Sequence, residues 1–447
     1  MTAASMFRPA PWFLPALAIA ALFWVTHPGY LSFDSAVAFW SARQDRYVDI
    51  SGVLLPKLWH WMLGFSEGTT GIRVLLGTLL SVGFGWLGSE LWRTASASRR
   101  WVAALVLPLC PVFLIVAPHI WSDVLLLACL LWASASAASL NRVVGPKARA
   151  ALVAILLLSC LAATLTRHNA LLALPPILWW GLMPLVRSGF WRTAACGFVL
   201  ALLALTAGTI RDHTVTTRLD TWAVTFLYDL QAVSIATRTD DSPSLIPPQL
   251  TGPGLKVAEL RAAWHPYSAT RLFSGTQSGV SDPTVAPLTP EQSSALRSAW
   301  ILILDEPAYW QQRWRLTEAL WGTYREPMLR GQAEHPGQSV MADNPVLEVP
   351  QRAAAPIWRT VVDKLFRVGA AAPVLYVGLA ILSMLVWRPS GARMALMASA
   401  FLYAAPYAWI APSAELRYLL WPCVAAWIVF WLGVLTRRVD PANADVG

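Results

Sequence analysis

Long apolar runs separated by short polar turns make up most of this chain. A helix rising about 1.5 Å per residue needs about 20 residues to cross a hydrocarbon core of about 30 Å. Ten runs approach that length. The pattern therefore predicts an all-α polytopic membrane protein with ten transmembrane helices. The runs cover residues 11–28, 73–92, 102–118, 123–140, 150–166, 170–186, 193–210, 369–387, 394–411 and 418–436.

One long interruption, residues 211–367, is too polar to span a membrane and too long for a simple loop. It opens with a helical pattern over 219–238, in which large apolar residues recur at a spacing of four. Residues 239–292 are rich in Pro, Ser, Thr and Gly, which is typical of turns. Residues 294–323 indicate a second helix that turns or breaks near Pro307.

These patterns predict three regions. Residues 1–210 form an N-terminal membrane domain whose first loop, 29–69, carries the candidate chemistry. Residues 211–367 form a small, mostly irregular extracytoplasmic domain that packs over the membrane part. Residues 368–447 supply the last helices and a short cytoplasmic tail.

The composition fits the same class. Hydrophobic residues make up 56% of the chain, charged residues 13%, and the chain contains 25 Trp, a balance outside the range of soluble globular proteins. All five cysteines fall within the predicted spans, which favours small buried side chains over a disulfide framework or a metal cluster. No small-residue cleavage site follows the first run, so we expect it to be a span and not a signal peptide.

The basic residues predict the orientation, because short cytoplasmic loops retain Lys and Arg. With the N-terminus inside, thirteen basic residues lie in inner segments and only Arg167 and Arg417 lie in the short outer turns. Both termini are then cytoplasmic, loop 29–69 and segment 211–367 lie outside, and the chain belongs in a cell inner membrane. The inner residues are Arg8, Arg93, Arg99, Arg100, Arg142, Lys147, Arg149, Arg187, Arg192, Arg388, Arg393, Arg437 and Arg438.

Ionisable residues suited to chemistry gather on the predicted outer side. All seven histidines fall there. A charge at membrane depth is costly unless it is paired or hydrated, so each such residue is a candidate site residue. Because the outer loops open on one face, we expect their side chains to line one cavity. The four groups are Asp34, Asp49, Lys57 and His60; His119 and Asp123; Arg167 and His168; and Glu415 and Arg417.

Several short motifs follow one another in a recognisable order. Asp34 stands just beyond the first run, a Gly- and Asp-containing stretch ends at Pro56, and Asp123 follows the third run. RHNALLALPP occupies 167–176 and ELRYLLWP occupies 415–422. Together these motifs resemble the C-type glycosyltransferase superfamily, polytopic enzymes that use polyprenyl-phosphate sugars and include lipid A aminoarabinose transferases and protein mannosyltransferases.

The resemblance implies a catalytic loop. Asp34 would be the catalytic carboxylate that deprotonates or orients an acceptor hydroxyl, and Asp49 would be a second carboxylate for the acceptor or for a divalent cation. The chain departs from the superfamily in its ISGVLLP stretch, where related loops place aromatic or histidine residues beside the proline. This stretch directly follows Asp49, so the departure bears on the role assigned to Asp49.

The resemblance also implies the binding partners. They are a polyprenyl-phosphate-linked sugar donor, a glycan, lipid or protein acceptor, and membrane lipids. The donor phosphate would be held by Lys57, Arg167 and Arg417, and the substrate would be contacted by His60, Asp123, His168 and Glu415. No cofactor is implied apart from the divalent cation. The formal charge of +9 lies in the membrane part, which favours lipid headgroups and not nucleic acid as its partner.

Other interpretations of these residues remain open at this stage. Asp34 and Asp123 are well placed to be N-caps, and Glu415 with Arg417 could be a structural ion pair. Among other functions, a transporter or flippase would need polar residues halfway through several spans. An anchoring protein would tolerate a neutral residue at position 34, and an O-antigen ligase or polymerase would rely on Arg or His in the long loop.

Overall fold

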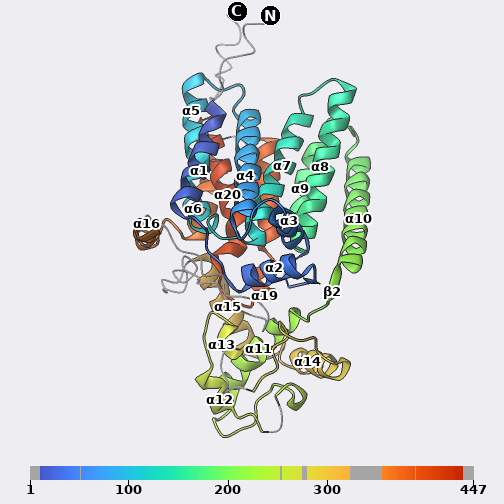
Figure 1. Ribbon diagram of the computed structural model, residues 1–447, viewed down its shortest axis with the longest axis vertical. Coiled ribbons are helices and arrows are strands. Elements are labelled where there is room, and N and C mark those ends of the chain that lie inside the picture. Colours follow the sequence, from blue (N-terminus) through green and yellow to red (C-terminus); the bar gives the residue numbers. More distant parts are fainter. Residues whose placement is uncertain are drawn as a thin grey trace, which may run out of the picture.

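The computed structural model describes residues 11–50, 52–251, 254–273, 279–322, 355–387 and 389–435. Long helices run side by side in a bundle, and a smaller unit built from residues 222–321 lies at one end of it (Figure 1). The helices α2 and α3, which follow α1, lie at that same end of the bundle. Within the predicted domain 211–367, residues 252–253, 274–278 and 323–354 fall outside the described residues.

The ten apolar runs all contain helix. Five segments are long and apolar enough to cross a membrane unaided, and with the composition they identify a polytopic membrane protein. The count of ten spans stays a prediction, since the other helices are shorter. The bundle elements are η2 (Pro11–Phe13), α1 (Leu14–Val25), α4 (Thr70–Leu91), α5 (Ala97–Val106), η3 (Leu107–Leu109), α6 (Pro111–Val116), α7 (Ser122–Leu140), α8 (Pro146–Thr166), α9 (Ala170–Leu182), α10 (Gly189–Thr214), α17 (Pro373–Val386), α18 (Gly391–Ala404), α19 (Tyr407–Ile410), η6 (Leu416–Leu419) and α20 (Leu420–Leu435).

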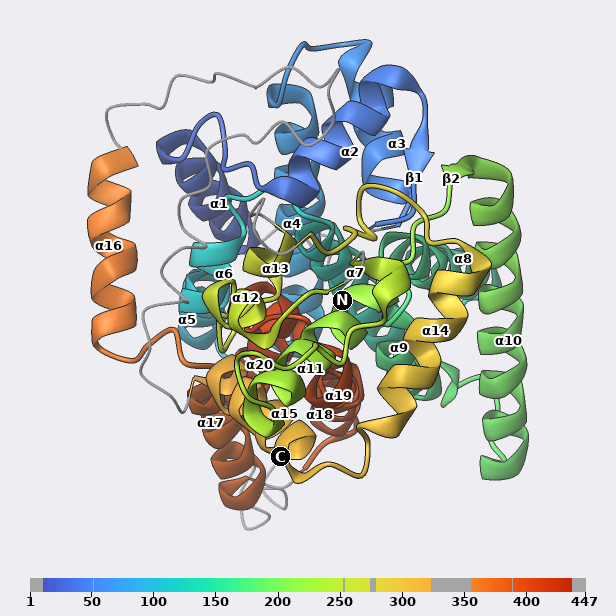
Figure 2. The same cartoon turned by 90° about the horizontal axis from the view of Figure 1, so that it is seen from below.

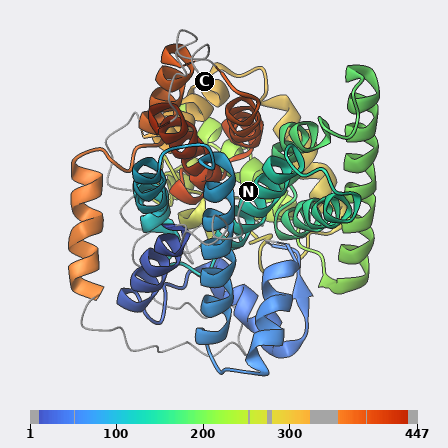
Figure 3. The same cartoon turned by 90° about the horizontal axis from the view of Figure 1, so that it is seen from above.

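The bundle is organised around α7, which contacts α4, α8 and α9 and is buried along almost its whole length. Its alanine and serine residues allow neighbouring backbones to approach closely, as is usual between helices in a membrane. The helix α10, by contrast, is the least buried of the five long segments. Seen from the opposite end of the bundle, it stands as a separate green helix at one edge (Figure 3).

The third run does not form the single helix that we expected over 102–118. It divides into α5, η3 and α6. Pro108 and Pro111 lie at the two breaks, and each lacks the amide hydrogen that a continuous helix needs. The helix α6 ends at Val116, and the turn 118–121 that follows leads into the first turn of α7.

The first loop contains two helices, α2 (Phe33–Gln44) and α3 (Leu54–Leu63). The helix α2 packs against other parts of the chain, because its Ala36, Phe39 and Ala42 are buried in protein. A short strand, β1 (Tyr47–Val48), follows α2 and pairs in parallel with β2 (Val215–Thr217), which follows α10. The first loop is therefore packed between α10 and the rest of the bundle end.

The smaller unit has its own apolar core. We call it the polar unit, because its sequence is too polar to span a membrane. As predicted, 219–238 contains a helix, and the chain turns just before Pro307. Leu227 and Leu230 of its first helix are fully buried, because other helices of the unit cover that helix. The elements are α11 (Trp222–Thr237), η4 (Pro248–Leu250), α12 (Val257–Ala262), α13 (Thr270–Phe273), α14 (Pro290–Leu302) and α15 (Pro307–Trp321).

The helix α15 joins the polar unit to the bundle, since it touches both α17 and α19. Figure 2, which views the molecule from the side of the polar unit, shows α11, α15 and α19 overlapping near the centre of the bundle. The helix α16 (Ala355–Arg367) lies along the outer flank in the same view, and its Val362 is buried in the main hydrophobic core.

Candidate functional site

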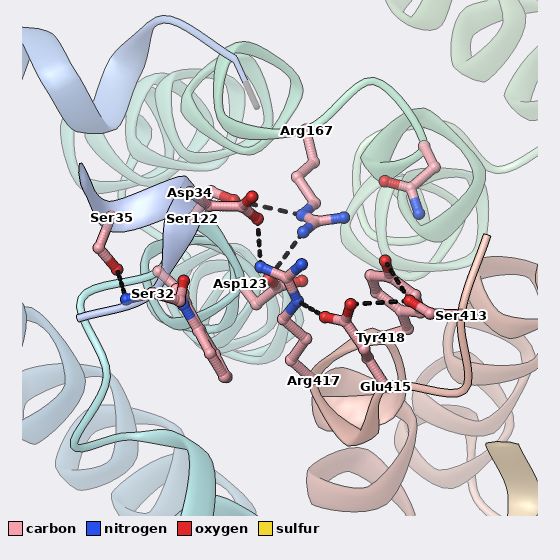
Figure 4. Close-up of polar contacts among 12 residues, drawn as sticks. Ser32, Asp34, Ser35, Ser122, Asp123, Arg167, Ser413, Glu415, Arg417 and Tyr418 are labelled. Atoms are coloured by element: carbon pink, nitrogen blue, oxygen red, sulfur yellow. Dashed lines mark hydrogen bonds and ion pairs between the residues drawn. The ribbon is translucent and has the colours of Figure 1, made fainter. Parts of the chain in front are cut away.

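Five charged side chains from distant parts of the sequence meet at the bundle end that faces the polar unit (Figure 4). We call them the charged cluster: Asp34, Asp123, Arg167, Glu415 and Arg417. Arg417 donates through Nη1 to Asp34 Oδ2 and through Nε to Glu415 Oε2. Arg167 donates through Nη2 to Asp123 Oδ2 at 2.7 Å, and through Nε to Ser122 Oγ at 3.3 Å.

The charged cluster is buried on one side and open on the other. The side chains of Asp123 and Arg417 are 1% and 9% exposed, whereas those of Asp34 and Glu415 keep 19% and 26% of their surface. Three carboxylates face two guanidinium groups, so the formal charge of the cluster is negative by one. The accessible carboxylates are thus those that share Arg417.

Asp34 is positioned by hydrogen bonds around the start of α2. Ser32 is the N-cap, and Ser35 forms a capping box with it. Ser35 Oγ also donates to the carbonyl of Ile120 at 2.9 Å, and Trp121 Nε1 donates to Ser32 Oγ at 2.6 Å. Asp34 is therefore not the N-cap, and the start of α2 is tied to the turn that carries Asp123.

The backbone before α2 follows the same turn closely. The amide of Tyr30 donates to the carbonyl of Pro118 at 3.1 Å, and the amide of Ile120 donates to the carbonyl of Tyr30 at 3.2 Å. Gly29 has a φ of +100°, and a Cβ there would lie 3.0 Å from Arg73 Cδ. Glycine is required at this position both by the backbone conformation and by the close approach.

Aromatic rings surround both arginines. The guanidinium carbon of Arg417 lies 4.9 Å from the centroid of Trp121 and 5.4 Å from that of Tyr418. Tyr418 also lies 5.6 Å from the guanidinium carbon of Arg167 and stacks on Tyr407. Such contacts stabilise a cation and hold its plane in place. Sequence reasoning assigned no role to these three rings, although Trp121 and Tyr418 lie beside predicted site residues.

The charge of Arg167 is fixed by its surroundings. Burial lowers the pKa of Arg167, but Asp123 together with Tyr407 and Tyr403 outweighs burial and raises it, so the guanidinium stays protonated. Asn169, two residues further on, donates to the hydroxyl of Tyr407 at 2.7 Å. The RHN motif thus contributes a charged group and a structural hydrogen bond.

Two more of the predicted site residues lie near the β1–β2 pairing. Asp49 accepts a hydrogen bond from the amide of Leu219 at 2.7 Å, and its other oxygen lies 3.9 Å from Arg211 Nη2. Partial loss of hydration and the charge of Arg211 lower the pKa of His168, while Asp49 opposes them. The structure therefore places Asp49 and His168 beside Arg211.

Lys57 and His60 are exposed on α3. Lys57 Nζ lies 4.5 Å above the ring of Tyr47, and His60 Nδ1 is 2.6 Å from the carbonyl oxygen of Ala42. These contacts belong to the first loop and not to the charged cluster. The predicted site residues thus fall into the charged cluster and two further sets, Asp49 with His168 and Lys57 with His60; whether they line one cavity stays a prediction.

A metal was the only cofactor that the sequence suggested. Within the described ranges, no group of three or more His, Cys, Asp or Glu side chains is arranged to hold a metal ion. The five cysteines are buried free thiols. A divalent cation at Asp49 stays a prediction of the sequence.

The cluster combines groups that bind an anion with a group that can take a proton. Two guanidinium groups present donors suited to phosphate oxygens. Asp34 is a partly exposed carboxylate whose acceptor oxygen is held by one of those same guanidinium groups. An anion that engaged Arg417 would therefore compete directly with Asp34.

No protein-family model and no curated protein matches this chain. Among solved structures, it is similar to the crystal structure of ArnT from Cupriavidus metallidurans bound to undecaprenyl phosphate. The identity is 14%, the alignment covers 94% of this chain and 76% of that chain, and the TM-score is 0.37. Because a likeness of this size establishes neither fold nor activity, function has to be argued from the residues themselves.

Proposed function

We propose that this chain is a membrane glycosyltransferase that moves a sugar from a polyprenyl-phosphate donor to an acceptor hydroxyl at the extracytoplasmic face. The observation that carries this proposal is the sharing of Arg417 between Asp34 and Glu415. A guanidinium group that is buried, stacked on Trp121 and paired with an accessible carboxylate is suited to exchange that carboxylate for a phosphate.

In the proposed reaction, the oxygen of the acceptor hydroxyl attacks the anomeric carbon of the donor sugar. Its proton passes to the carboxylate of Asp34, and the bond between the anomeric carbon and the phosphate oxygen breaks. Polyprenyl phosphate leaves with the bonding electrons. Arg417 and Arg167 stabilise the negative charge that develops on it, because both are already oriented at the site.

The pairing of Arg417 also suggests an order of binding. Without donor, Asp34 accepts a hydrogen bond from a cation and is a weakened base. When the donor phosphate engages Arg417, the hydrogen bond to Asp34 is lost and the carboxylate becomes available to the acceptor. The donor is therefore expected to bind before the acceptor.

The remaining predicted residues are assigned to the approach to this site. Lys57 and His60 are exposed on α3, and Asp49 and His168 lie beside Arg211. We propose that Lys57 attracts the donor phosphate, and that the other three contact the acceptor or the sugar. Asp123 holds Arg167, and Glu415 holds Arg417.

The orientation in a cell inner membrane is part of the proposal. The charged cluster, the first loop and the polar unit share one end of the bundle, which supports a common face for all three (Figure 1). The distribution of basic residues favours the extracytoplasmic face for that end and cytoplasmic termini. A lipid-linked donor would reach the cluster from the membrane, and the acceptor would reach it from the polar unit.

The test is Asp34→Asn in the purified full-length chain. We expect transfer from a lipid-linked sugar donor to fall about 10²–10⁴-fold, the usual contribution of a general base. We also expect polyprenyl phosphate to bind at least as tightly as in the wild type, because Arg417 loses a competing carboxylate. Opposite changes in turnover and affinity would separate this role from a structural one.

The matched control is Asp212→Asn, which alters an exposed carboxylate paired with Arg218 elsewhere in the molecule. This control should leave both readouts unchanged. Wild-type turnover in Asp34→Asn would rule out the proposed mechanism. An O-antigen ligase or polymerase would show that result together with loss of activity on replacing Arg or His residues of the polar unit.

A further inference from the structure

We propose that Arg313 is a positioning residue for the transfer reaction. Through it the polar unit holds the segment 410–415 in place, and this segment leads directly to the guanidinium group of Arg417. The inference rests on the proposed function for the role of Arg417, but the fastening itself is a property of the structure that can be measured separately.

Arg313 lies in α15 and joins three parts of the molecule. Its Nη2 is 2.5 Å from Asp229 Oδ2 in α11, and the two side chains are only 3% and 1% exposed. Trp300 Nε1 of α14 donates to the same carboxylate oxygen at 2.9 Å. The Nη1 of Arg313 donates to the carbonyl of Ala411 at 2.6 Å. The ion pair thus orients the guanidinium group that donates a hydrogen bond to the carbonyl at the end of α19.

The neighbouring residue Gln312 supports the same segment by a second route. Its amide group donates to the carbonyl of Pro266 at 2.8 Å. The loop that follows then pairs with the bundle, because Tyr267 accepts from the amide of Ala414 at 2.9 Å and Ala269 donates to the carbonyl of Pro412 at 3.1 Å. Consecutive residues of α15 therefore hold segment 410–415 from two sides.

A third contact comes from α11, where Thr225 Oγ1 donates to the carbonyl of Ile410 at 2.9 Å. Segment 410–415 runs between α19 and η6, so most of its backbone has no helix of its own to hold it. The carbonyl groups of Ile410, Ala411 and Pro412 and the amide of Ala414 are bonded to the polar unit instead. At its far end, Ser413 Oγ donates to Glu415 Oε1 at 2.7 Å, and Glu415 accepts from Arg417.

This arrangement makes the position of Arg417 dependent on the polar unit. Displacement of a catalytic geometry by about 1 Å can lower a rate by about a hundredfold. Arg417 lies six residues beyond Ala411, and the intervening chain is held by backbone hydrogen bonds to the polar unit. Loosening of that unit should therefore act on phosphate binding without removing any group that touches the donor.

The experiment compares two threonine variants of α11 in the full-length protein. Thr225→Val removes the hydroxyl that holds Ile410 and keeps the shape of the side chain. Thr237→Val removes a hydroxyl that bonds only within the helix, to the carbonyl of Val233. Arg313→Lys is the stronger variant, because a point charge cannot serve both Asp229 and Ala411 with a planar fork.

The first readout is amide hydrogen exchange in peptides that cover 411–418. We expect exchange to be faster by about threefold in Thr225→Val and by about tenfold in Arg313→Lys, with no change in Thr237→Val. Peptides from α4 serve as an internal control in every variant. Unchanged exchange over 411–418 in both Thr225→Val and Arg313→Lys would overturn the inference.

The second readout is the affinity for polyprenyl phosphate in detergent micelles. In each variant the affinity should fall by about the same factor as the exchange rate rises. Thr237→Val should match the wild type. Faster exchange with unchanged affinity would show that the segment is fastened but does not position Arg417, which also overturns the inference. Failure of the proposed function is recognised separately, since Arg417→Ala would then leave affinity unchanged.

Discussion

Two arginine–carboxylate arrangements are linked by segment 410–415, and they differ in how far their side chains are shielded from solvent. Arg313 meets one carboxylate, that of Asp229, and both side chains are almost fully buried. Arg417 meets two carboxylates, and its partner Asp34 keeps 19% of its side-chain surface. The first arrangement is sealed, and the second is open to solvent.

The difference decides what each arrangement can do. Breaking a sealed pair leaves a buried charge without a partner, which costs about 3–5 kcal/mol, so the pair is suited to hold its surroundings in one geometry. An open pair can exchange one partner for water or for an anion at much lower cost. Chemistry that requires partner exchange therefore belongs to Arg417, and fastening belongs to Arg313.

The sharpest test of this comparison is the stability of Asp229→Asn against Asp34→Asn. We expect Asp229→Asn to lower the free energy of unfolding by about 3–5 kcal/mol, because Arg313 would lose its only charged partner among the described residues. Asp34→Asn should cost less than about 1 kcal/mol, since Glu415 still neutralises Arg417. Thermal unfolding in detergent measures both. Equal losses would remove the distinction between the two arrangements.

A second test asks whether Arg417 exchanges its partners for phosphate. Arg417→Ala should weaken binding of a polyprenyl-phosphate donor by at least about tenfold, the loss of one charge-assisted hydrogen bond. Arg417→Lys should restore only part of the affinity, because one point charge replaces a fork. Arg218→Ala, which removes an exposed guanidinium group, is the control. Wild-type donor affinity in Arg417→Ala would exclude the residue from the site.

The pair of Asp49 with Arg211 is longer than either of these arrangements and at least as exposed as that of Arg417 with Asp34. Its atoms are 3.9 Å apart and its side chains are 14% and 26% exposed, so the pair itself contributes about 0–1 kcal/mol. We expect Asp49→Asn to lower turnover only a few-fold if Asp49 orients the acceptor. A loss as large as that of Asp34→Asn, together with inhibition of the wild type by a chelator, would instead assign Asp49 to a divalent cation.

The smallest expected effect concerns His168, which is an exposed residue. Its pKa is lowered in the folded protein, so between that pKa and the unfolded value of about 6.5 the unfolded chain binds more protons. Stability should therefore fall as the pH drops below about 6.5. His168→Asn should flatten this part of the unfolding-temperature profile. An unchanged profile would show that the surroundings of His168 do not affect its protonation.

The sequence was sufficient to find the members of the charged cluster and to suggest the pair of Glu415 with Arg417, but not the pairs that Asp34 and Asp123 form. Asp34, Asp123, Arg167, Glu415 and Arg417 stand out because charges are rare at span ends, and that rarity is a local property of the sequence. Which arginine meets which acid depends on helix packing. Asp49, Lys57 and His60 satisfy the same local rule, yet β1 and α3 direct their contacts elsewhere.

Local sequence patterns could not predict the ion pair by which Arg313 fastens the polar unit. Asp229 and Arg313 lie 84 positions apart in a segment where charges are common, so neither stands out. The break in the third run, in contrast, had a visible cause in Pro108 and Pro111. Membrane-length apolar runs conceal such breaks, since hydropathy averages over the residues that interrupt the helix.

The pairing of Asp34 with Arg417 joins positions 383 apart, and this has a consequence for biosynthesis. Arg167 can meet Asp123 as soon as α8 has been made, because only 44 positions separate them. The carboxylate of Asp34 can meet Arg417 only after almost the whole chain has been made. A nascent chain that ends before residue 417 therefore lacks the guanidinium group that Asp34 contacts in the folded protein.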